Sequence, residues 1–326
     1  MLIGIYGFGS IGRLVAREAI ERGYEIAGVV DIDRALIGRD IGEILGIGSI
    51  GLEISDDISV LSDADVVVHA TGSYLDKVYN QIVSVLDMGI DVVSTCETLA
   101  YPYYRYPVLA VKLNEIALDQ GVSVLGTGVN PGFLLDTLAT VLASSVTQVK
   151  SIRVVRSVDA SKRRESFKKK IGIGMDFRVV EDMMKRGELS GHVGYAESVY
   201  LIAHAGDLQL TKVLEEQKPL VAEETIEWMG LRIEKGFCRG IRGTGIGYVY
   251  DKEIIRIEFY AYVGAPEYEE ITIVGKNYSV TWRSSGTPGD RGTVAVVLNI
   301  AEKIKKLPPG LHLMTDLIPF KIRFIS

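Results

Sequence analysis

Six residues near the start of the chain have the types and spacing that could hold a dinucleotide. The run Gly7-Phe8-Gly9-Ser10-Ile11-Gly12 lies between a short apolar stretch and a segment with helical spacing. In such a turn the first glycine permits a tight bend, the second lets the backbone approach a pyrophosphate, and the third lets helix and strand pack closely. Asp31 follows about 20 residues later, where a carboxylate can bind a ribose. The predicted cofactor-binding residues of this region are therefore Gly7, Phe8, Gly9, Ser10, Ile11, Gly12 and Asp31.

The acid at position 31 also bears on which dinucleotide binds. A carboxylate accepts a hydrogen bond from a ribose 2′-hydroxyl and repels a 2′-phosphate, which favours NAD over NADP. Arg34, a further predicted cofactor contact, and Arg13 are close in sequence and could offset that repulsion, so NADP remains an alternative. A second glycine pattern, Gly46 to Gly51, has neither a strand before it nor a helix after it and is predicted to be a loop.

A further cofactor segment follows an apolar run, at the expected carboxyl end of a strand. Ligands of open parallel sheets bind across such strand ends. Ala70, Thr71 and Gly72 are small and would leave room for the ribose and the nicotinamide, although a plain strand-to-helix turn is the alternative. His69, just before them, is expected to be a packed or hydrogen-bonded strand residue rather than a catalyst.

Glu97 ends the segment Ser94-Thr95-Cys96-Glu97 and is the predicted catalytic residue. Its position places a carboxylate at a strand end, on the expected nicotinamide side, among apolar neighbours such as Leu99 that suit general acid–base work. The alternative is a loop glutamate or a residue at the start of a helix. Cys96 is expected to be a small buried residue at the cofactor site rather than a nucleophile, because no suitable histidine accompanies it.

The glycine-rich segment Gly126-Thr127-Gly128-Val129-Asn130-Pro131-Gly132 could bring bare backbone close to a ligand. Asn130 is predicted to cap a helix that has Pro131 at its first position. It is also expected to offer its carbonyl to the substrate. A domain hinge is the alternative interpretation.

Basic and histidine residues of the second half are candidates for substrate binding. Arg156 ends a predicted strand within a basic run and is predicted to anchor a substrate carboxylate by bidentate pairing, with a solvated charged face as the alternative. His192 lies in a glycine-rich loop and is predicted to touch substrate, whereas His204 is expected to be structural. No spacing of His, Cys, Asp or Glu predicts a metal site.

The elements that must position these residues differ between the two halves of the chain. Short apolar runs alternate with helical segments up to residue 130, which predicts a Rossmann-type, doubly wound α/β domain with a parallel sheet over 1–130. The expected strands are Leu2–Tyr6, Tyr24–Val30, Asp65–His69, Asp91–Ser94 and Val122–Gly126, and the expected helices are Ile11–Arg22, Leu75–Met88 and Leu109–Asp119.

Beyond this point, β-rich stretches broken by helices predict an α+β substrate domain over 131–288, with a mostly antiparallel sheet. The expected helices are Phe133–Ala143, Met175–Arg186 and Ser198–Ala205, and the expected strands are Val149–Val158, Leu220–Ala222, Ile226–Trp228, Leu231–Ile233, Ile254–Val263, Glu269–Ile273 and Tyr278–Trp282. The region 289–326 is expected to pack back on the first domain as a helix, Gly292–Lys306, followed by a tail.

Composition excludes several classes of protein. The 326 residues are 47% hydrophobic and 24% charged, so the chain is expected to bury a core rather than to be disordered. The net charge of −6 and the lack of a long basic block argue against a nucleic-acid partner, and no apolar run is long enough for a transmembrane helix. Two cysteines are too few for a disulfide framework, and the chain does not start like a signal peptide, so we expect a cytoplasmic protein.

Together these motifs resemble those of the 2,4-diaminopentanoate dehydrogenases and the related native amine dehydrogenases, within the dihydrodipicolinate reductase-like group. The resemblance covers nearly the whole chain. It is carried by Gly7–Gly12, Ser94–Glu97, Gly126–Gly132, Arg156–Arg164, Lys169–Gly172, Gly191–Gly194 with Glu197-Ser198, Gly240–Arg242 and Pro308–Gly310.

The resemblance implies oxidative deamination of a small amine or a diamino acid of the 2,4-diaminopentanoate type, with NAD or NADP, reversible as reductive amination. It implies that Glu97 handles the amine or ammonia, that Asn130 assists and that Arg156 lies near the substrate. It also implies a homodimer. An imine or carbonyl reductase and a non-catalytic NAD-binding protein are the alternatives, although the adjacent histidines of true dihydrodipicolinate reductases are missing from this sequence.

Overall fold

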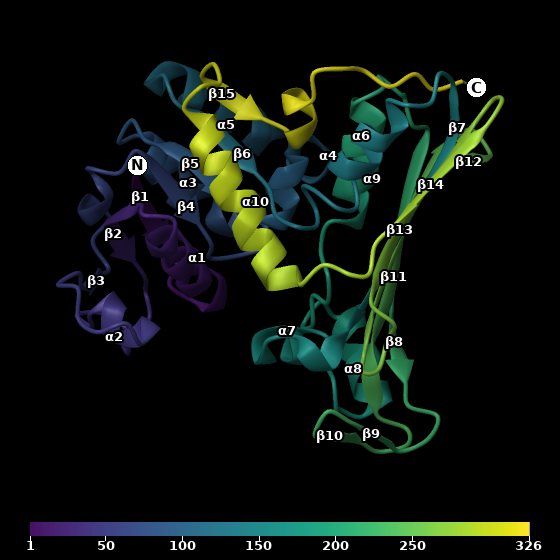
Figure 1. Ribbon diagram of the computed structural model, residues 1–326, viewed down its shortest axis with the longest axis horizontal. Coiled ribbons are helices and arrows are strands. Elements are labelled where there is room, and N and C mark those ends of the chain that lie inside the picture. The colour runs from purple at the N-terminus through teal and green to yellow at the C-terminus, as the bar shows by residue number, and fades with distance from the viewer. Residues whose placement is uncertain (326) are drawn as a thin grey trace. The chain divides into compact units, whose positions relative to one another are not determined.

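The computed structural model describes residues 1–325 and divides into two units, each with its own large sheet (Figure 1). Unit 1 contains Met1–Val129 and Asp290–Met314, and unit 2 contains Asn130–Gly289 and the chain from Thr315 onward. The backbone therefore passes from one unit to the other after Val129, after Gly289 and after Met314.

The sheet of unit 1 is parallel in its strand pairs and has the order β15-β6-β5-β4-β1-β2-β3. Its strands are β1 (Leu2–Tyr6), β2 (Glu25–Val30), β3 (Ile54–Ser55), β4 (Val66–His69), β5 (Asp91–Ser94), β6 (Ser123–Gly126) and β15 (Gly310–His312). Central strands such as β4 and β6 are buried along their whole length, which explains their continuous apolar sequences. The predicted α/β architecture is confirmed, and the edge strands β3 and β15 are additions too short to show a pattern.

Helices cover the sheet of unit 1. They are α1 (Ser10–Glu21), α2 (Ile41–Leu45), α3 (Leu75–Leu86), α4 (Pro102–Arg105), α5 (Pro107–Gln120) and α10 (Gly289–Ile304), with the 3₁₀ turns η1 (Ile58–Leu61) and η2 (Glu97–Ala100). Val78, Ile82 and Val85 form the apolar stripe of α3 and pack into the core with the strand residues Val67 and Val92. Figure 1 shows α10 and β15, in yellow, beside the earlier elements of this unit.

Ion pairs connect α10 to the start of the chain. Arg22 at the end of α1 contacts Glu302 of α10 at 3.3 Å. Lys305 lies 2.5 Å from Asp65, just before β4. The helix predicted near the C-terminus therefore belongs to unit 1.

The sheet of unit 2 has the order β14-β13-β7-β12-β11-β8, and β7 and β12 form its parallel pair within antiparallel neighbours. Its strands are β7 (Val149–Asp159), β8 (Lys212–Val221), β11 (Cys238–Val249), β12 (Lys252–Tyr262), β13 (Tyr268–Gly275) and β14 (Ser279–Arg283), and β9 (Ile226–Trp228) and β10 (Leu231–Ile233) form a separate hairpin. The predicted α+β unit with a mostly antiparallel sheet is confirmed.

Strand β11 is absent from the sequence prediction, and its glycines explain why. Gly243, Gly245 and Gly247 face α9 and give the strand no apolar alternation. A Cβ added at Gly243 would lie 2.1 Å from the hydroxyl oxygen of Tyr195 on α9. Glycine therefore lets the helix lie directly on the sheet.

The helices of unit 2 lie on one side of its sheet (Figure 1). They are α6 (Thr137–Ala143), α7 (Glu165–Lys170), α8 (Phe177–Lys185) and α9 (Tyr195–His204), with the 3₁₀ turns η3 (Ala160–Lys162) and η4 (Met314–Leu317). The expected helix start with Asn130 as cap is wrong. Asp136 is the N-cap of α6 and accepts from the Thr137 N–H, and the Asn130–Pro131 peptide is cis.

The expected packing of the C-terminal region on the first domain extends only to Met314. From Thr315 the chain belongs to unit 2, because Ile322 and Phe324 pack into its core and the Val149 N–H donates to the Arg323 carbonyl at 2.8 Å. Within residues 1–325, no helix combines the length and apolar character needed to span a membrane.

Candidate functional site

The glycine loop between β1 and α1 has the geometry of a pyrophosphate site. Gly7 has φ +98°, and a Cβ at Gly12 would lie only 1.9 Å from the Gly7 carbonyl oxygen, so both positions require glycine. A Cβ at Gly9 would meet nothing within 4 Å, because this residue faces open space. Gly9 is the N-cap of α1 and provides no side-chain cap. The first N–H groups of the helix, from the exposed Ser10 and the half-buried Ile11, are therefore directed at the position where an anion would bind.

Asp31 lies beside this loop, directly after β2. One carboxylate oxygen accepts from the Phe8 N–H at 2.5 Å, and the other accepts from the Asp33 N–H at 2.9 Å. The side chain of Phe8 is fully buried, so only its backbone is available to a ligand. Arg13 donates from Nε to the Phe8 carbonyl at 3.0 Å, and Arg34 is exposed. The carboxylate keeps lone pairs that a ribose hydroxyl can use.

The segment after β4 contacts the glycine loop. A Cβ at Gly7 would lie 2.8 Å from the Ala70 carbonyl oxygen and from Cγ2 of Thr71, so the two segments are in contact at the carboxyl ends of β1 and β4. Thr71 is exposed, and Ala70 and Gly72 are half-buried. The dinucleotide fingerprint and the small residues expected to accommodate the nucleotide therefore lie at the same edge of the sheet, and these residues fit a dinucleotide.

His69 is a structural residue, as predicted. Its Nδ1 lies 2.9 Å from the Ser94 hydroxyl, and its Nε2 lies 2.9 Å from Oε1 of Gln81 and 2.8 Å from the Thr71 hydroxyl. Burial lowers the pKa of this imidazole to about 4, so the ring is neutral. Its hydrogen bonds connect β4, β5 and α3 behind the cofactor segment.

Glu97 begins η2, three residues after β5 ends. It is half-buried, and the backbone around it is held in place: the Thr98 N–H donates to the Ser73 carbonyl at 3.1 Å, and the Thr98 hydroxyl accepts from the Leu75 N–H at 2.8 Å. The structure therefore places this carboxylate at the same edge of the unit 1 sheet as Gly9 and Ala70, at the end of the strand next to β4.

Cys96 is a small buried residue, as predicted, and its place at the cofactor site stays a prediction. Cys96 is fully buried in the core of unit 1 with Leu99 and Ala110. Burial, together with the nearby Glu97 charge, raises the pKa of its thiol to about 12. The residue packs the base of η2 and is not a nucleophile at neutral pH.

In unit 2, Asn130 is half-buried and its side-chain oxygen accepts a hydrogen bond from Nη1 of Arg156. The loop after it is held by the buried Asp136, which accepts from the Gly132 N–H at 2.9 Å and from the Ser198 hydroxyl at 2.6 Å. Burial raises the pKa of Asp136 despite these hydrogen bonds. The side-chain oxygen of Asn130 is therefore directed at Arg156, and the expected contact of Asn130 with substrate stays a prediction.

Arg156, the predicted anchor of a substrate carboxylate, is enclosed by protein groups, and that role stays a prediction. Its side chain is 0% exposed, and all three guanidinium nitrogens face protein oxygens. Nη1 donates to Asn130, Nη2 donates to the Thr287 carbonyl at 2.9 Å, and Nε lies 3.1 Å from Oε1 of Glu269. Each guanidinium nitrogen therefore has a protein oxygen beside it.

His192 is almost fully buried and contacts the rings of Tyr195 and Phe259, with centroid distances of 4.9 and 4.7 Å. Its backbone N–H donates to Gln217 at 2.8 Å, but its side-chain Nε2 has no hydrogen-bond partner among the described residues. Burial, and then the charges of Lys170, Arg156 and Arg163, lower the pKa of His192 well below its usual value. The imidazole is therefore neutral in a positively charged environment.

Glu269 is a buried partner of Arg156 that sequence reasoning missed. It is 1% exposed on β13 and lies directly opposite Arg156 across the β13–β7 pair. One signal was available, since a buried arginine needs an acid in a neighbouring strand. The register that selects Glu269 is not visible in the sequence.

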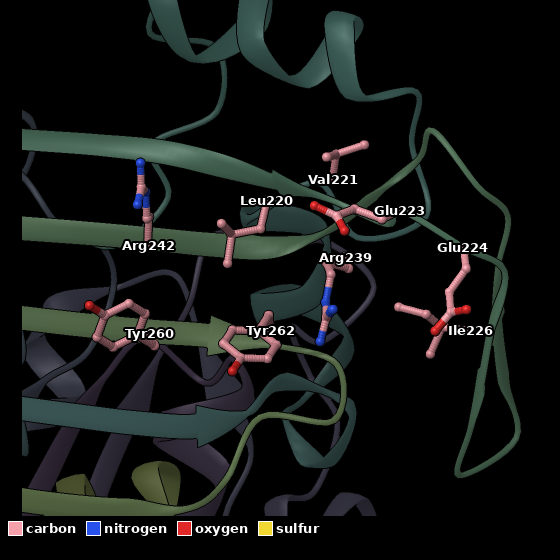
Figure 2. Close-up of a pocket in the computed structure, with 9 residues that line it drawn as sticks. All are labelled: Leu220, Val221, Glu223, Glu224, Ile226, Arg239, Arg242, Tyr260 and Tyr262. Carbon is pink, nitrogen blue, oxygen red and sulfur yellow. The ribbon is translucent and has the colours of Figure 1, made fainter.

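A separate pocket lies near the end of the unit 2 sheet (Figure 2). Its volume is about 740 Å³, and its lining includes Arg239, Arg242, Tyr260 and Tyr262. The guanidinium of Arg239 lies over the Tyr262 ring at 4.5 Å. Tyr260 and Tyr262 alternate with the core residues Phe259 and Ala261, so they are on the sheet face opposite the helices. None of the predicted site residues lines this pocket.

Comparison with known proteins gives matches over both units. The family model described as "2,4-diaminopentanoate dehydrogenase C-terminal domain" matches residues 133–323, and the model "Dihydrodipicolinate reductase, N-terminus" matches residues 1–96. A 2,4-diaminopentanoate dehydrogenase from Acetoanaerobium sticklandii is 29% identical over 96% of this chain and 92% of the relative. A 4-hydroxy-tetrahydrodipicolinate reductase from Archaeoglobus fulgidus is 44% identical, over 19% of this chain and 23% of the relative.

Solved structures show the same fold. An amine dehydrogenase from Mycobacterium smegmatis superposes with a TM-score of 0.86 at 20% identity, covering 99% of this chain and 98% of that one. GenD2 from gentamicin A biosynthesis, solved with NAD, has a TM-score of 0.58 at 16% identity, covering 97% and 89% of the two chains.

Proposed function

The chain belongs to the family defined by the 2,4-diaminopentanoate dehydrogenase C-terminal domain, and we propose on that ground that it is a nicotinamide-dependent dehydrogenase acting on CH–NH₂ groups. The reaction is oxidative deamination of a small amine or a diamino acid to the ketone, with reductive amination as its reverse. The family match over residues 133–323 carries the proposal, because it covers the substrate unit rather than only the nucleotide-binding unit. The relative that aligns over 96% of the chain supports the same reaction class.

The cofactor role falls to the glycine loop and its neighbours in unit 1. Ser10 and Ile11 would hold the pyrophosphate through backbone N–H groups, and Asp31 would hold the adenosine ribose. When bound, the nicotinamide supplies the acceptor for the hydride that leaves the amine-bearing carbon. Asp31 favours NAD, because its carboxylate is fixed at the loop and repels a phosphate. The exposed Arg34 could reach a 2′-phosphate, so the preference requires measurement.

Glu97 is the proposed general base. An ammonium group must lose a proton before hydride can leave its carbon, and a carboxylate at the strand end can accept that proton. In the hydrolytic step the same carboxylate would orient water toward the imine carbon, and in reverse it would orient ammonia. A positioned base of this kind contributes about 10²–10⁴-fold to the rate.

Asn130 and His192 are the proposed substrate contacts of unit 2. Asn130 has its oxygen bound to Arg156, so it would contact the substrate through its amide N–H groups. The neutral His192 lies close enough to Lys170 and Arg163 to feel their charge, which favours an anionic group such as a substrate carboxylate. Arg156 supports this site indirectly, by holding Asn130.

The nucleotide-binding unit alone also fits a reductase of an imine or carbonyl compound, since residues 1–96 match the dihydrodipicolinate reductase N-terminus. The two reactions differ in one requirement. Reductive amination of a ketone needs ammonium, whereas reduction of a preformed imine or of a carbonyl to an alcohol does not. Coenzyme oxidation with ketones, with and without ammonium, therefore distinguishes them.

The decisive experiment is a panel of amines, amino acids and diamino acids with NAD and NADP, followed by the absorbance of the reduced nicotinamide. We expect reduction with at least one amine and release of stoichiometric ammonia. Coenzyme reduction by alcohols alone, or nucleotide binding with no turnover on any amine, would contradict the proposal.

The assembly and its location form a finer part of the proposal. We propose a homodimer formed through the sheet face of unit 2 opposite its helices, which carries Ile246 and Tyr260 among paired charges. Ile246→Asp should convert a dimer into a monomer in analytical ultracentrifugation, and a wild-type monomer would contradict it. A cytoplasmic location is supported by two buried free cysteines, Cys96 and Cys238.

A further inference from the structure

The buried pair Arg156–Glu269 has two properties that a purely structural ion pair does not need. First, its arginine contacts both ends of the segment that forms the bulk of unit 2: Asn130 is the first residue of that segment, and Thr287 is close to its last residue, Gly289. Second, Asn130 at the end of this chain of contacts is only half-buried. The buried contacts therefore end on a residue that is partly exposed to solvent.

Glu269 is held more tightly than an ion pair alone would require. Its Oε1 accepts from the Thr287 N–H at 3.1 Å and lies 3.1 Å from Nε of Arg156. Its Oε2 accepts from the Ser284 hydroxyl and, at 3.3 Å, from the Thr287 hydroxyl. With its carboxylate satisfied on all sides, Glu269 can move little, and neither can the guanidinium beside it.

The contact with Arg156 decides which end of the Asn130 amide faces outward. A guanidinium has only donors, so the atom of Asn130 that faces Nη1 must be the oxygen. The amide nitrogen, with its two N–H groups, is then directed away from Arg156. Asn130 held in this way can donate hydrogen bonds to a ligand oxygen and is a poor acceptor for an ammonium group.

We propose that Glu269 is a positioning residue. It acts through Arg156 to fix Asn130 as a hydrogen-bond donor toward an oxygen at the reaction centre. That oxygen belongs to the substrate carboxylate, the ketone carbonyl or the attacking water. The inference rests on the proposed dehydrogenase activity. Under this proposal the two polar side chains have complementary tasks, since Glu97 accepts a proton while Asn130 donates a hydrogen bond. It also explains why a fully buried arginine is present in the centre of the sheet.

A double-mutant cycle tests the path from Glu269 to Asn130. We expect Glu269→Gln to lower kcat roughly tenfold in the wild-type background and less than about twofold in Asn130→Ala, because the residue to be positioned is then missing. Additive losses, with the same factor in both backgrounds, would overturn the proposal. If Glu269→Gln does not fold, Thr287→Val can take its place in the cycle, because it removes one hydroxyl that donates to Glu269. The expected losses of kcat are then smaller.

The matched control is Glu258→Gln. Glu258 forms an ion pair with Arg153 at 2.5 Å. Arg153 is on β7 like Arg156, but three residues away, so it is on the opposite face of the strand. Among the described residues, no hydrogen bond or ion pair links this pair to Asn130. Glu258→Gln should lower thermal stability without changing kcat. A loss of kcat equal to that of Glu269→Gln would assign the effect to damage of the sheet and would overturn the positioning role.

Asn130→Asp tests the donor role separately. The new carboxylate can still accept from Arg156, so the melting temperature should not fall, but the outward N–H groups are lost. Removal of one such donor costs about 10²–10³-fold in kcat in comparable sites. An Asp variant as active as wild type would overturn the donor assignment. A wild-type protein without amine oxidation would instead overturn the proposed function, and crystal structures of wild type and Glu269→Gln would then decide whether Glu269 orients Asn130.

Discussion

The carboxylate of Asp31 accepts a hydrogen bond from the backbone N–H of Phe8 at 2.5 Å. This contact joins the end of β2 to the glycine loop after β1, two neighbouring strands of the parallel sheet. One side chain therefore both holds the loop and presents a negative charge where a ribose would bind. A change at position 31 should alter cofactor choice more than it alters the fold, provided that the new residue can still accept from Phe8.

Asp31→Ser should shift coenzyme preference toward NADP. The hydroxyl can still accept from Phe8, but the charge that repels a 2′-phosphate is gone. We expect the ratio of kcat/KM for NAD to that for NADP to fall at least tenfold, which corresponds to about 1.4 kcal/mol. Steady-state kinetics with both coenzymes measures it. Asp33→Ser, two residues later on the exposed side, is the control and should keep the wild-type ratio; an unchanged ratio in Asp31→Ser would refute the assignment.

Two alanine substitutions in the same loop should separate binding from folding. A Cβ at Gly9 meets open space, so Gly9→Ala should fold normally while obstructing the approach of a pyrophosphate and raising the coenzyme Kd. A Cβ at Gly12 would lie 1.9 Å from the Gly7 carbonyl oxygen, so Gly12→Ala should destabilise unit 1 itself. Thermal unfolding and coenzyme titration of both variants test this. Equal coenzyme affinity in Gly9→Ala and wild type would place the pyrophosphate elsewhere.

Glu97→Gln should keep coenzyme binding and lose turnover. The amide has nearly the same shape but cannot accept the proton of the ammonium group, so kcat should fall by about 10²–10⁴-fold. Coenzyme fluorescence titration and steady-state amine oxidation provide the two measurements. Glu115→Gln, an exposed position on α5, is the matched control. Wild-type turnover in Glu97→Gln would remove Glu97 from the mechanism.

The neutral, buried His69 makes the stability of unit 1 depend on pH. Burial lowers its pKa from 6.5 to about 4 in the folded state. Between these values the unfolded chain binds the extra proton, so the contribution of His69 is complete above pH 6.5 and is lost as the pH falls toward 4. The difference amounts to roughly 3 kcal/mol of unfolding free energy. Denaturant unfolding at several pH values measures it.

Variants of the same hydrogen-bond network make the test specific. His69→Gln removes the titrating ring and should reduce the slope of unfolding free energy against pH below 6.5. Ser94→Ala removes the partner of Nδ1 but keeps the ring, so it should lower stability while the slope stays. The same slope in His69→Gln and wild type would mean that the pH dependence comes from other groups.

Local patterns predicted unit 1 well, because its elements and its site depend on short stretches of chain. The expected roles of Gly7, Gly9 and Gly12 follow from their spacing within one turn. Those of Asp31 and Glu97 follow from their places just beyond strand ends. In a parallel sheet all such strand ends meet at one edge, so the order of elements along the chain already groups these residues. Only burial distinguished Cys96, whose side chain packs inward, from its neighbour Glu97.

In unit 2 the sequence determined the residue types, while the tertiary structure decided their partners. Arg156 was predicted to bind substrate, but its contacts are with Glu269, across the β7–β13 register, and with Asn130, which precedes both in the sequence. Strand β11 was not predicted because its glycines, which let α9 pack closely on the strand, give no apolar alternation. Strand periodicity places a side chain on one face of a sheet, but the pairing between distant strands chooses which charge meets it there, and that choice is made only when the whole sheet assembles.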